Sequence, residues 1–371
     1  MKDYLKVYKA RILVMSPTYV GNGKEISKKE YRLSAETQKV VVYDPTKFYQ
    51  LMRNAGKVAQ YENFLMNDSR NDLEMWMSDN RISISSVNEA IRYAVSCGDG
   101  MGFGKSKVQI MEFAKDPYGL PYVPGSSIKG MLRTILLGYE ISRNPEKYSQ
   151  LAERIKRFSS NYPDKRNYQK ETDEIEICTF HTLDREGVKT ENAVNDNLQG
   201  LIISDSKPLK LKDLVLCKKI EYHTNNEEKS LNILRECLRS GTYIDFTITI
   251  DTQVCPYDIN QIMEAVKAFN DMYYDCFLSK FNSKKRPADT VYLGGGAGFV
   301  SKTILYYLFG SDEGVAVTER VFKNTLPQKV FESHGHQNDS RYGVSPHILK
   351  CTRLNEKRFQ MGMCRLIIED M

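Results

Sequence analysis

The residues best suited to bind an anion lie between Val291 and Gly310, in the sequence VYLGGGAGFVSKTILYYLFG. Glycines cluster in this way where a backbone turns with positive φ or closely approaches another group. The apolar residues that follow repeat at helical spacing, Gly310 is a suitable C-terminal stop, and Lys302 falls on the outward face. A glycine turn that opens a helix directs several backbone N–H groups at one point, which suits a phosphate. The candidate residues of this segment are Gly294, Gly295, Gly296, Gly298, Ser301 and Lys302.

A nucleotide-binding loop is the first alternative for this segment. Residues 301–303, Ser-Lys-Thr, resemble the end of a Walker A motif, but Ser301 occupies the position of the last required glycine. A second near match, GDGMGFGKS at residues 98–106, has Asp99 where the first glycine is needed. Such short motifs arise often by chance, so the sequence argues against an NTPase.

A second candidate anion site lies at the start of the segment Pro121–Tyr139, PYVPGSSIKGMLRTILLGY. One of the two serines is expected to cap a helix whose apolar residues step by three and four along one stripe. Lys129 and Arg133 are four residues apart, so they project together near the helix N-terminus, where backbone N–H groups favour an anion. The candidate residues here are Gly125, Ser126, Ser127, Lys129 and Arg133.

Two further segments combine cations with turns or strands. Gly21, Gly23 and Lys24 form a turn with a cation at its rim, a candidate backbone site for phosphate. The C-terminal stretch from Arg341 to Arg365 is basic, with Glu356 as its single acid, and we predict that its Lys350 and Arg353 contact a nucleic-acid backbone.

Composition is compatible with such a partner. The 371 residues exceed what one core usually supports, so two domains are expected. A net charge of +6 favours an anionic partner. The N-terminus lacks the continuous apolar region of a signal peptide, and no run of about 20 apolar residues occurs, which predicts a cytoplasmic protein with no membrane partner. Eight scattered cysteines without a C-x-x-C pair predict reduced thiols.

Regular elements can be predicted in several places. The segments expected to form strands are 4–15, 31–33, 40–43, 201–208, 214–222, 242–251 and 363–368, and those expected to form helices begin near residues 45, 126 and 259. Residues 79–119 and 143–191 are polar or weakly patterned, and we interpret them as an exposed insertion and a loop connection. Asp44 and Pro45 indicate a helix N-terminus, and the aromatics that follow have the spacing of core residues.

These elements follow a β-α-β-β-α-β order in each half of the chain. That order is typical of ferredoxin-like units. We therefore predict an α+β protein of two fused ferredoxin-like domains, with residues 1–209 in the first and residues 210–371, which include the glycine-rich loop, in the second.

Several motifs resemble those of RAMP proteins, in the same order. They are SPTYVGNG (16–23), YVPGSSIKGMLRT (122–134), ISDSKP (203–208), YLGGGAGFVSKT (292–303), PHILKCTR (346–353) and MGMCRLIIE (361–369). Within that superfamily the chain is most similar to the subunit of type III-A CRISPR (Csm) effector complexes that caps the 3′ end of the guide RNA. The resemblance spans almost the whole chain, with little of it in residues 70–119 and 143–197.

The resemblance implies two fused RRM-like RAMP folds that bind CRISPR guide RNA without cutting it. It also implies assembly with other RAMP subunits, especially the repeated backbone subunit, and support of 3′-end maturation by recruited host nucleases. The target-cleaving aspartate of these complexes belongs to the backbone subunit and is not transferred here. Glycine turns and cations agree with this role. A protein that binds guide RNAs of different sequence must contact the RNA backbone rather than read the bases. Tyr122, Tyr292 and Phe299 flank the loops and are either core residues or stacking platforms for bases.

The main alternative is a CRISPR RNA-processing endoribonuclease of the same superfamily, which usually needs a histidine as general acid or base. The histidines are His181, His223, His334, His336 and His347. His334 and His336 could chelate a metal, but no third ligand follows closely in the sequence, so a solvated loop is the preferred interpretation. His347 either contacts RNA or completes a strand end. We predict no metal and no cofactor.

Overall fold

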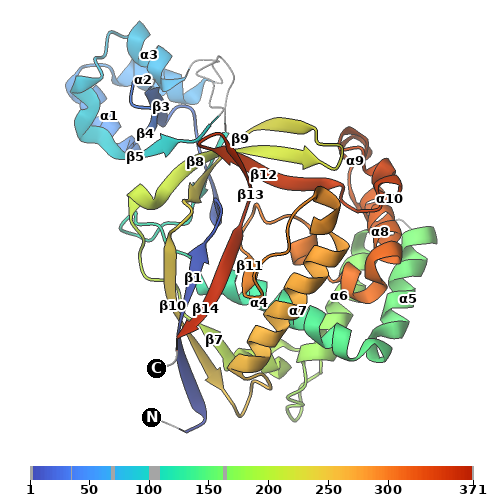
Figure 1. Ribbon diagram of the computed structural model, residues 1–371. Coiled ribbons are helices and arrows are strands. Elements are labelled where there is room, and N and C mark those ends of the chain that lie inside the picture. Colours follow the sequence, from blue (N-terminus) through green and yellow to red (C-terminus); the bar gives the residue numbers. More distant parts are fainter. Residues whose placement is uncertain (1–2, 35, 68–71, 100–108, 162–164, 370–371) are drawn as a thin grey trace.

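The computed structural model describes residues 3–34, 36–67, 72–99, 109–161 and 165–369 (Figure 1). The fold is α+β, as predicted, and its strands form two curled sheets, consistent with two ferredoxin-like units. Within the described ranges, no helix is both long and apolar enough to cross a membrane. The eight cysteines are free thiols, as expected.

The first sheet has the order β11-β14-β1-β10-β7, with every neighbouring pair antiparallel. Its strands are β1 (Leu5–Val14), β7 (Leu201–Ile203), β10 (Tyr243–Asp251), β11 (Thr290–Tyr292) and β14 (Met363–Glu369). Helix α4 (Gly125–Arg143) lies between β1 and β7 in chain order, helix α7 (Ile259–Cys276) follows β10, and the two helices pack against each other. Leaving the edge strand β11 aside, this is the β-α-β-β-α-β order of a ferredoxin-like unit.

Alternating side chains explain the central strands of this sheet. In β1, Ala10, Ile12 and Val14 are buried, whereas Arg11 on the opposite face pairs with Asp245 of β10 at 3.1 Å. In β10, the residues Ile244, Phe246, Ile248 and Ile250 are buried. Strands β1 and β10 and helix α7 confirm the predictions from sequence. The two strands were predictable because a strand face buried in a core needs apolar residues at every second position.

The second sheet follows the path β2-β6-β9-β8-β5-β4-β3, and β12 pairs with both β8 and β13. Its strands are β2 (Gly21–Ile26), β3 (Tyr31–Ser34), β4 (Lys39–Tyr43), β5 (Ile91–Cys97), β6 (Gln109–Phe113), β8 (Leu214–His223), β9 (Glu228–Leu238), β12 (Ile348–Leu354) and β13 (Lys357–Gln360). The long hairpin of β8 and β9 is its centre. Both sheets thus draw strands from the two ends of the chain.

A domain boundary at residue 209 does not follow these sheets. β1 lies before that residue, yet it is hydrogen-bonded to β10 and β14, which lie after it. In the second sheet, β5 before the boundary pairs with β8 after it. The predicted division into 1–209 and 210–371 would therefore cut both sheets, since strands distant in sequence complete each one.

A small helical unit stands apart from the main body at the upper left of Figure 1. It contains α1 (Pro45–Asn54), α2 (Val58–Met66) and α3 (Leu73–Asp79), packed on β3 and β4. Asp44 caps α1 through a bond from the Lys47 N–H, as predicted. Phe48, Tyr61 and Trp76 form its buried core, which confirms that these aromatics are packing residues rather than stacking platforms.

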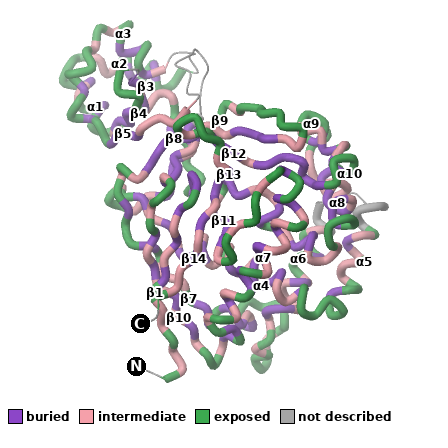
Figure 2. Tube along the Cα trace, in the orientation of Figure 1, coloured by how far each residue is buried: buried purple, intermediate pink, exposed green. Residues whose placement is uncertain are grey.

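Two segments that we expected to be irregular contain regular elements, although the glycine-rich stretch 100–108 of the first lies outside the described residues. Residues 79–119 contain β5 and β6, and residues 143–191 contain α5 (Pro145–Asn161) and α6 (Lys165–Phe180). In α5, Tyr148 and Ile155 are buried and Leu151 lies between them, a helical spacing hidden among many charges. The helix packs on α6 and α8, and Figure 2 shows mainly intermediate and exposed residues along its described part.

Three further helices follow the glycine-rich loop in the sequence. They are α8 (Leu305–Thr325), α9 (Gln328–Ser333) and α10 (Asp339–Tyr342). Gly310 ends the first of two helical segments within α8, as predicted, with φ 67° and ψ −166°. The helix resumes beyond it because the apolar pattern continues through Val315 and Phe322, both buried.

Candidate RNA-binding site

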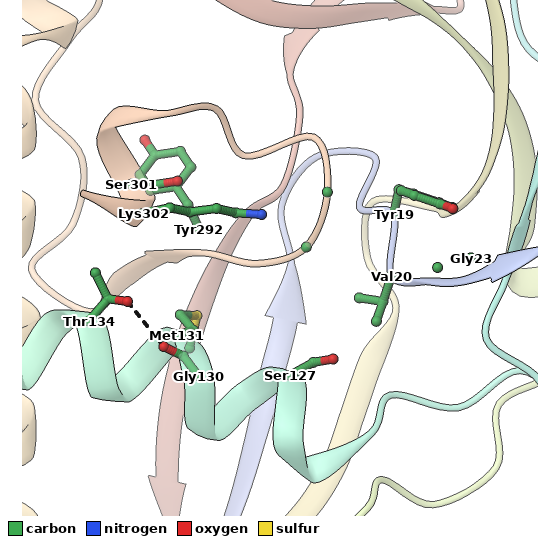
Figure 3. A pocket seen from close by; sticks show the side chains of 13 residues that line it. Tyr19, Val20, Gly23, Ser127, Gly130, Met131, Thr134, Tyr292, Ser301 and Lys302 are labelled. Atoms are coloured by element: carbon green, nitrogen blue, oxygen red, sulfur yellow. Dashed lines mark hydrogen bonds between the residues drawn. The ribbon is translucent and has the colours of Figure 1, made fainter. Parts of the chain in front are cut away.

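A cavity of about 430 Å³ lies where three of the predicted segments meet (Figure 3). These segments are the loop before β2, the first turns of α4, and the glycine-rich loop that follows β11. The residues that line it are Tyr19, Val20, Gly21, Gly23, Ser127, Gly130, Met131, Thr134, Tyr292, Gly294, Gly295, Ser301 and Lys302. The structure thus brings together motifs that are more than 250 residues apart in sequence.

The glycines of the loop allow close packing of two backbones. Gly294 has φ 86°, and a Cβ atom there would lie 2.0 Å from the carbonyl oxygen of Tyr19. The next residue, Gly295, donates its N–H to that same oxygen at 2.8 Å. A Cβ on Gly296 would lie 2.8 Å from the Cβ of Met361. These glycines therefore fix the loop against its neighbours, and the N–H of Gly295 is used internally.

Lys302 supplies a cation at the cavity. It ends a short 3-10 helix, Val300–Lys302, and Figure 3 shows its side chain extended towards the loop that carries Tyr19. The side chain is exposed, and partial desolvation by the surrounding protein lowers the pKa of its ammonium group, which Arg235 lowers further. Among the described residues, no carboxylate lies within 4 Å of its Nζ atom, whereas Ser301 is buried and bonds to the carbonyl of Gly298.

Two cations were not predicted from the sequence: Arg235, which lies next to the cavity residue Tyr19, and Lys219, which lies near Arg235. Arg235 of β9 places its guanidinium 5.1 Å from the ring centre of Tyr19, and its Nε atom is buried without a hydrogen-bond partner. Lys219 of β8 has a side chain only 17% exposed, and burial, aided by repulsion from Lys350 and Arg235, lowers its pKa to about 8. We call Lys219, Arg235 and Lys302 the cationic cluster, because Arg235 acts electrostatically on the other two.

The first turn of α4 does not have the predicted form. The helix begins at Gly125 directly after Pro124, and neither Ser126 nor Ser127 caps it through its side chain. The N–H of Gly125 instead donates to Asp205 Oδ1 at 2.7 Å, so an internal carboxylate occupies part of the expected anion site. Ser127 lines the cavity, whereas Ser126 is exposed outside it.

The two cations of α4 face away from the cavity. Arg133 donates to Glu176 of α6 and to Asp196, both at 2.7 Å, and its guanidinium lies over the ring of Phe180. Burial lowers the pKa of Lys129, which is one turn earlier on the same face. The structure therefore does not bring Lys129 and Arg133 together with Lys302, because Met131 and Thr134 on another face of α4 line the cavity.

Gly21, Gly23 and Lys24, which we predicted in a turn, instead belong to strand β2 at the edge of the cavity. Gly21 and Gly23 line it, and Gly23 has φ 83° with open space around the position of a Cβ atom. Lys24 is exposed and lines a neighbouring polar pocket of about 700 Å³ together with Arg92 and Lys115. This stretch therefore lines the cavity with the backbone of Gly21 and Gly23, and it adds the exposed cation Lys24 outside the lining.

The basic C-terminal strip is largely paired with acids. Lys350 Nζ lies 2.6 Å from a carboxylate oxygen of Glu221, and Arg353 makes several bonds of about 3 Å to Glu228, which Arg358 also contacts. These acids come from β8 and β9, which are distant in sequence. Lys350 still lies close to the glycine-rich loop, because its Cγ atom is 4.0 Å from the Cβ position of Gly298.

Aromatic and histidine side chains contribute little to the cavity surface. Tyr292 is buried, and Phe299 packs edge-on against Phe322, so both serve as packing residues. No histidine lines the cavity. His336 and His347 are buried elsewhere, which corrects the expectation of a solvated loop at residues 334–336.

A family model described as the RAMP superfamily matches residues 11–298. The chain belongs to the RAMP superfamily. Two curated relatives are described as "CRISPR system Cms protein Csm5". The Mycobacterium tuberculosis (strain H37Rv) protein is 27% identical over 396 residues, covering 99% of this chain and 99% of the relative. The Streptococcus thermophilus protein is 29% identical over 321 residues, covering 82% of both chains.

Two solved structures share the fold of this RAMP protein. A chain in a cryo-EM structure of a Csm–crRNA–target RNA ternary complex of a type III-A CRISPR-Cas system superposes with a TM-score of 0.64 at 19% identity, covering 98% of this chain and 100% of that one. The crystal structure of T. onnurineus Csm5 superposes with a TM-score of 0.62 at 18% identity, covering 96% and 99%.

Proposed function

We propose that this RAMP protein is the Csm5-like subunit of a cytoplasmic type III-A CRISPR effector complex. In this role it holds the 3′ end of the guide RNA and cleaves no RNA itself. Its partners are the guide RNA and the other RAMP subunits, especially the repeated backbone subunit, and host nucleases trim the guide end that it leaves exposed. Similarity over almost the full length to proteins described as Csm5 supports this proposal.

The observation that carries the proposal is the cationic cluster beside the cavity. Lys302 and Arg235 have no carboxylate within 4 Å among the described residues, in contrast to the paired cations Arg133 and Arg353. The Nε–H of Arg235 is a buried donor without a hydrogen-bond partner, so no carboxylate of the described chain binds this side of the guanidinium. Partly desolvated cations attract an anion more strongly than fully solvated ones do.

The cluster also fits a partner of variable sequence. The polar groups that line the cavity are the Lys302 ammonium, hydroxyls and backbone, and its aromatic residues are buried in the protein. Such groups bind phosphates and sugars and read little of the bases. A grip of this kind suits the end of a guide RNA, where the nucleotide sequence differs from one guide to another.

The test is salt-dependent binding of labelled single-stranded RNA, followed by fluorescence anisotropy. We expect the Lys302→Ala, Arg235→Ala double variant to bind more weakly than the wild type. Each lost phosphate contact should reduce the slope of log K against log salt by about 0.7, hence by about 1.4 for two contacts. Arg353→Ala is the matched control, because its cation is already held by Glu228, and it should leave the slope unchanged.

Two outcomes would contradict the proposal. An equal loss in both variants would mean that binding follows total charge and has no particular site. Shortened RNA after incubation with the wild type would favour the endoribonuclease alternative, since the proposal expects the RNA to be recovered intact.

A further inference from the structure

Three buried side chains converge behind the glycine-rich loop, outside the cavity described above. They are His336, Asp339 and His347, which are 6%, 0% and 4% exposed. One donor atom from each lies within 4.8 Å of the other two. In the sequence only His334 and His336 stand close enough to suggest a metal site, because Asp339 and His347 follow three and eleven residues after His336 and reach it only through the fold.

Asp339 is held with its two carboxylate oxygens facing the two imidazoles. Its Oδ2 atom lies 3.1 Å from His336 Nδ1, and its Oδ1 atom contacts His347 Nδ1. The hydroxyl of Ser345 donates to Oδ2 at 2.6 Å, and the backbone N–H of His347 donates to Oδ1 at 3.3 Å. These bonds fix the orientation of the carboxylate, as the outer hydrogen bonds of a metal-binding carboxylate do.

The charge of this carboxylate is not balanced by a lysine or arginine. Within the described part of the chain, the charged partners within 4 Å of Asp339 are limited to the two histidines. Burying a carboxylate without a cation is costly. A divalent cation would remove this imbalance, and imidazole nitrogens with one carboxylate oxygen are a ligand set that zinc accepts.

Two further imidazoles lie next to His336, Asp339 and His347. The ring of His223 is 5.3 Å from that of His347, and the ring of His334 is 5.7 Å from that of His336. A fourth donor is therefore close at hand, although His334 also lies 3.2 Å from Glu221. Four histidines with a buried aspartate in one place are more than a core ordinarily contains, since these residue types are seldom fully buried.

We propose that His336, Asp339 and His347 bind one divalent metal ion, with zinc as the ion that best fits these ligands. The ion would join the segment after α9 to the start of β12. This structural site is independent of the RNA-binding role proposed above.

The site also lies behind the glycine-rich loop. The ring of His336 is 4.6 Å from that of Phe322, and Phe322 is 4.7 Å from Phe299, which follows Gly298 in the loop. A metal ion at His336 would therefore stabilise the packing that supports the loop from behind, without contacting the cavity.

The experiment measures metal content and cobalt spectra of the full chain. We expect about one zinc ion per purified chain by mass spectrometry, as for other structural zinc sites. Chelator treatment should lower the melting temperature, and added Zn²⁺ should restore it. Asp339→Asn and His347→Gln should lose the metal, whereas His181→Gln is the control, because His181 lies apart and contacts the carbonyl of Thr190.

A ligand swap separates metal binding from simple packing. Thiolate binds zinc and cobalt well, so His336→Cys should keep the ion and add a sulfur-to-cobalt charge-transfer band to the Co²⁺ spectrum, whereas His336→Gln should not. The proposal is overturned if the chelator-treated wild type takes up no more Zn²⁺ than Asp339→Asn does. In that case Asp339 is only a hydrogen-bonding centre for the two histidines.

Discussion

Lys219→Met should stabilise the RNA-free protein while weakening its grip on RNA. The Lys219 ammonium is buried between other cations, and its nearest acid, Glu221 at 3.9 Å, is bonded more closely by Lys350 at 2.6 Å. Burial lowers the pKa of Lys219 from its usual 10.5 to about 8. The positive charge of Lys219 therefore destabilises the folded protein, and a bound phosphate would offset this destabilisation.

The size of that cost follows from the pKa. Below pH 8, Lys219 is protonated in both the folded and the unfolded chain, so the fold bears the whole penalty. Between pH 8 and 10.5 the folded chain releases the proton first, and the penalty disappears. At 1.36 kcal/mol for each pKa unit, the difference between 10.5 and about 8 gives about 3 kcal/mol as an upper value.

The assay is urea unfolding of the wild type and Lys219→Met at pH 7 and near pH 10.5. At pH 7 we expect the variant to be more stable by about 2 to 3 kcal/mol, and at the higher pH we expect the two to be nearly equal. RNA affinity should fall in the variant at pH 7. Lys218→Met is the matched control, because it removes a neighbouring lysine of β8 that lies outside the cluster.

One result would refute this reasoning. If Lys219→Met is less stable than the wild type at pH 7, then Lys219 is a favourable ion-pair partner of Glu221. The cationic cluster would then be a structural feature of the second sheet rather than a site for RNA phosphates.

Other substitutions separate packing from binding. Gly294→Ala should lower the free energy of unfolding by more than about 2 kcal/mol. The reason is that position 294 has positive φ and that the new Cβ atom would lie 2.0 Å from a backbone oxygen. Gly23→Ala has similar φ but open space, so a loss of only about 1 kcal/mol is expected in the same denaturation assay, and equal losses would contradict the packing role. Arg133→Met leaves Glu176 and Asp196 without their partner and should cost about 1 to 3 kcal/mol with RNA affinity unchanged. A clear fall in its RNA affinity by anisotropy would instead place α4's cations at the RNA.

The sequence predicted those elements whose burial has a simple period. β1 and β10 alternate cleanly, and the hairpin of β3 and β4 leads into the helix capped by Asp44, so local pattern and fold agree. Helix α5 was missed, since its three core-facing residues are dispersed among charged ones. The interleaving of both sheets could not be seen either, because it depends on pairing between distant strands.

The candidate site was predicted in part for the same reason. The three glycine-containing segments do meet at one cavity. However, the acids that form ion pairs with Arg133 and Lys350 come from elements far away in sequence. Lys219 and Arg235 were overlooked because a cation in a strand ordinarily marks the solvent face. Within the described residues Arg235 has no carboxylate partner and Lys219 shares Glu221 with Lys350, which becomes visible only when neighbouring strands are in place.

The most direct test of the central claim is a crosslinking experiment on the assembled effector complex. The guide RNA would carry a photoreactive nucleotide at its 3′ end or, in a second preparation, at its 5′ end, and crosslinked peptides would be identified by mass spectrometry. We predict that the 3′ probe crosslinks to this chain, in peptides that contain the 19–24 or 292–303 segment, and that the 5′ probe does not. Crosslinks of the 3′ probe to other subunits alone, or of the 5′ probe to this cavity, would contradict the account.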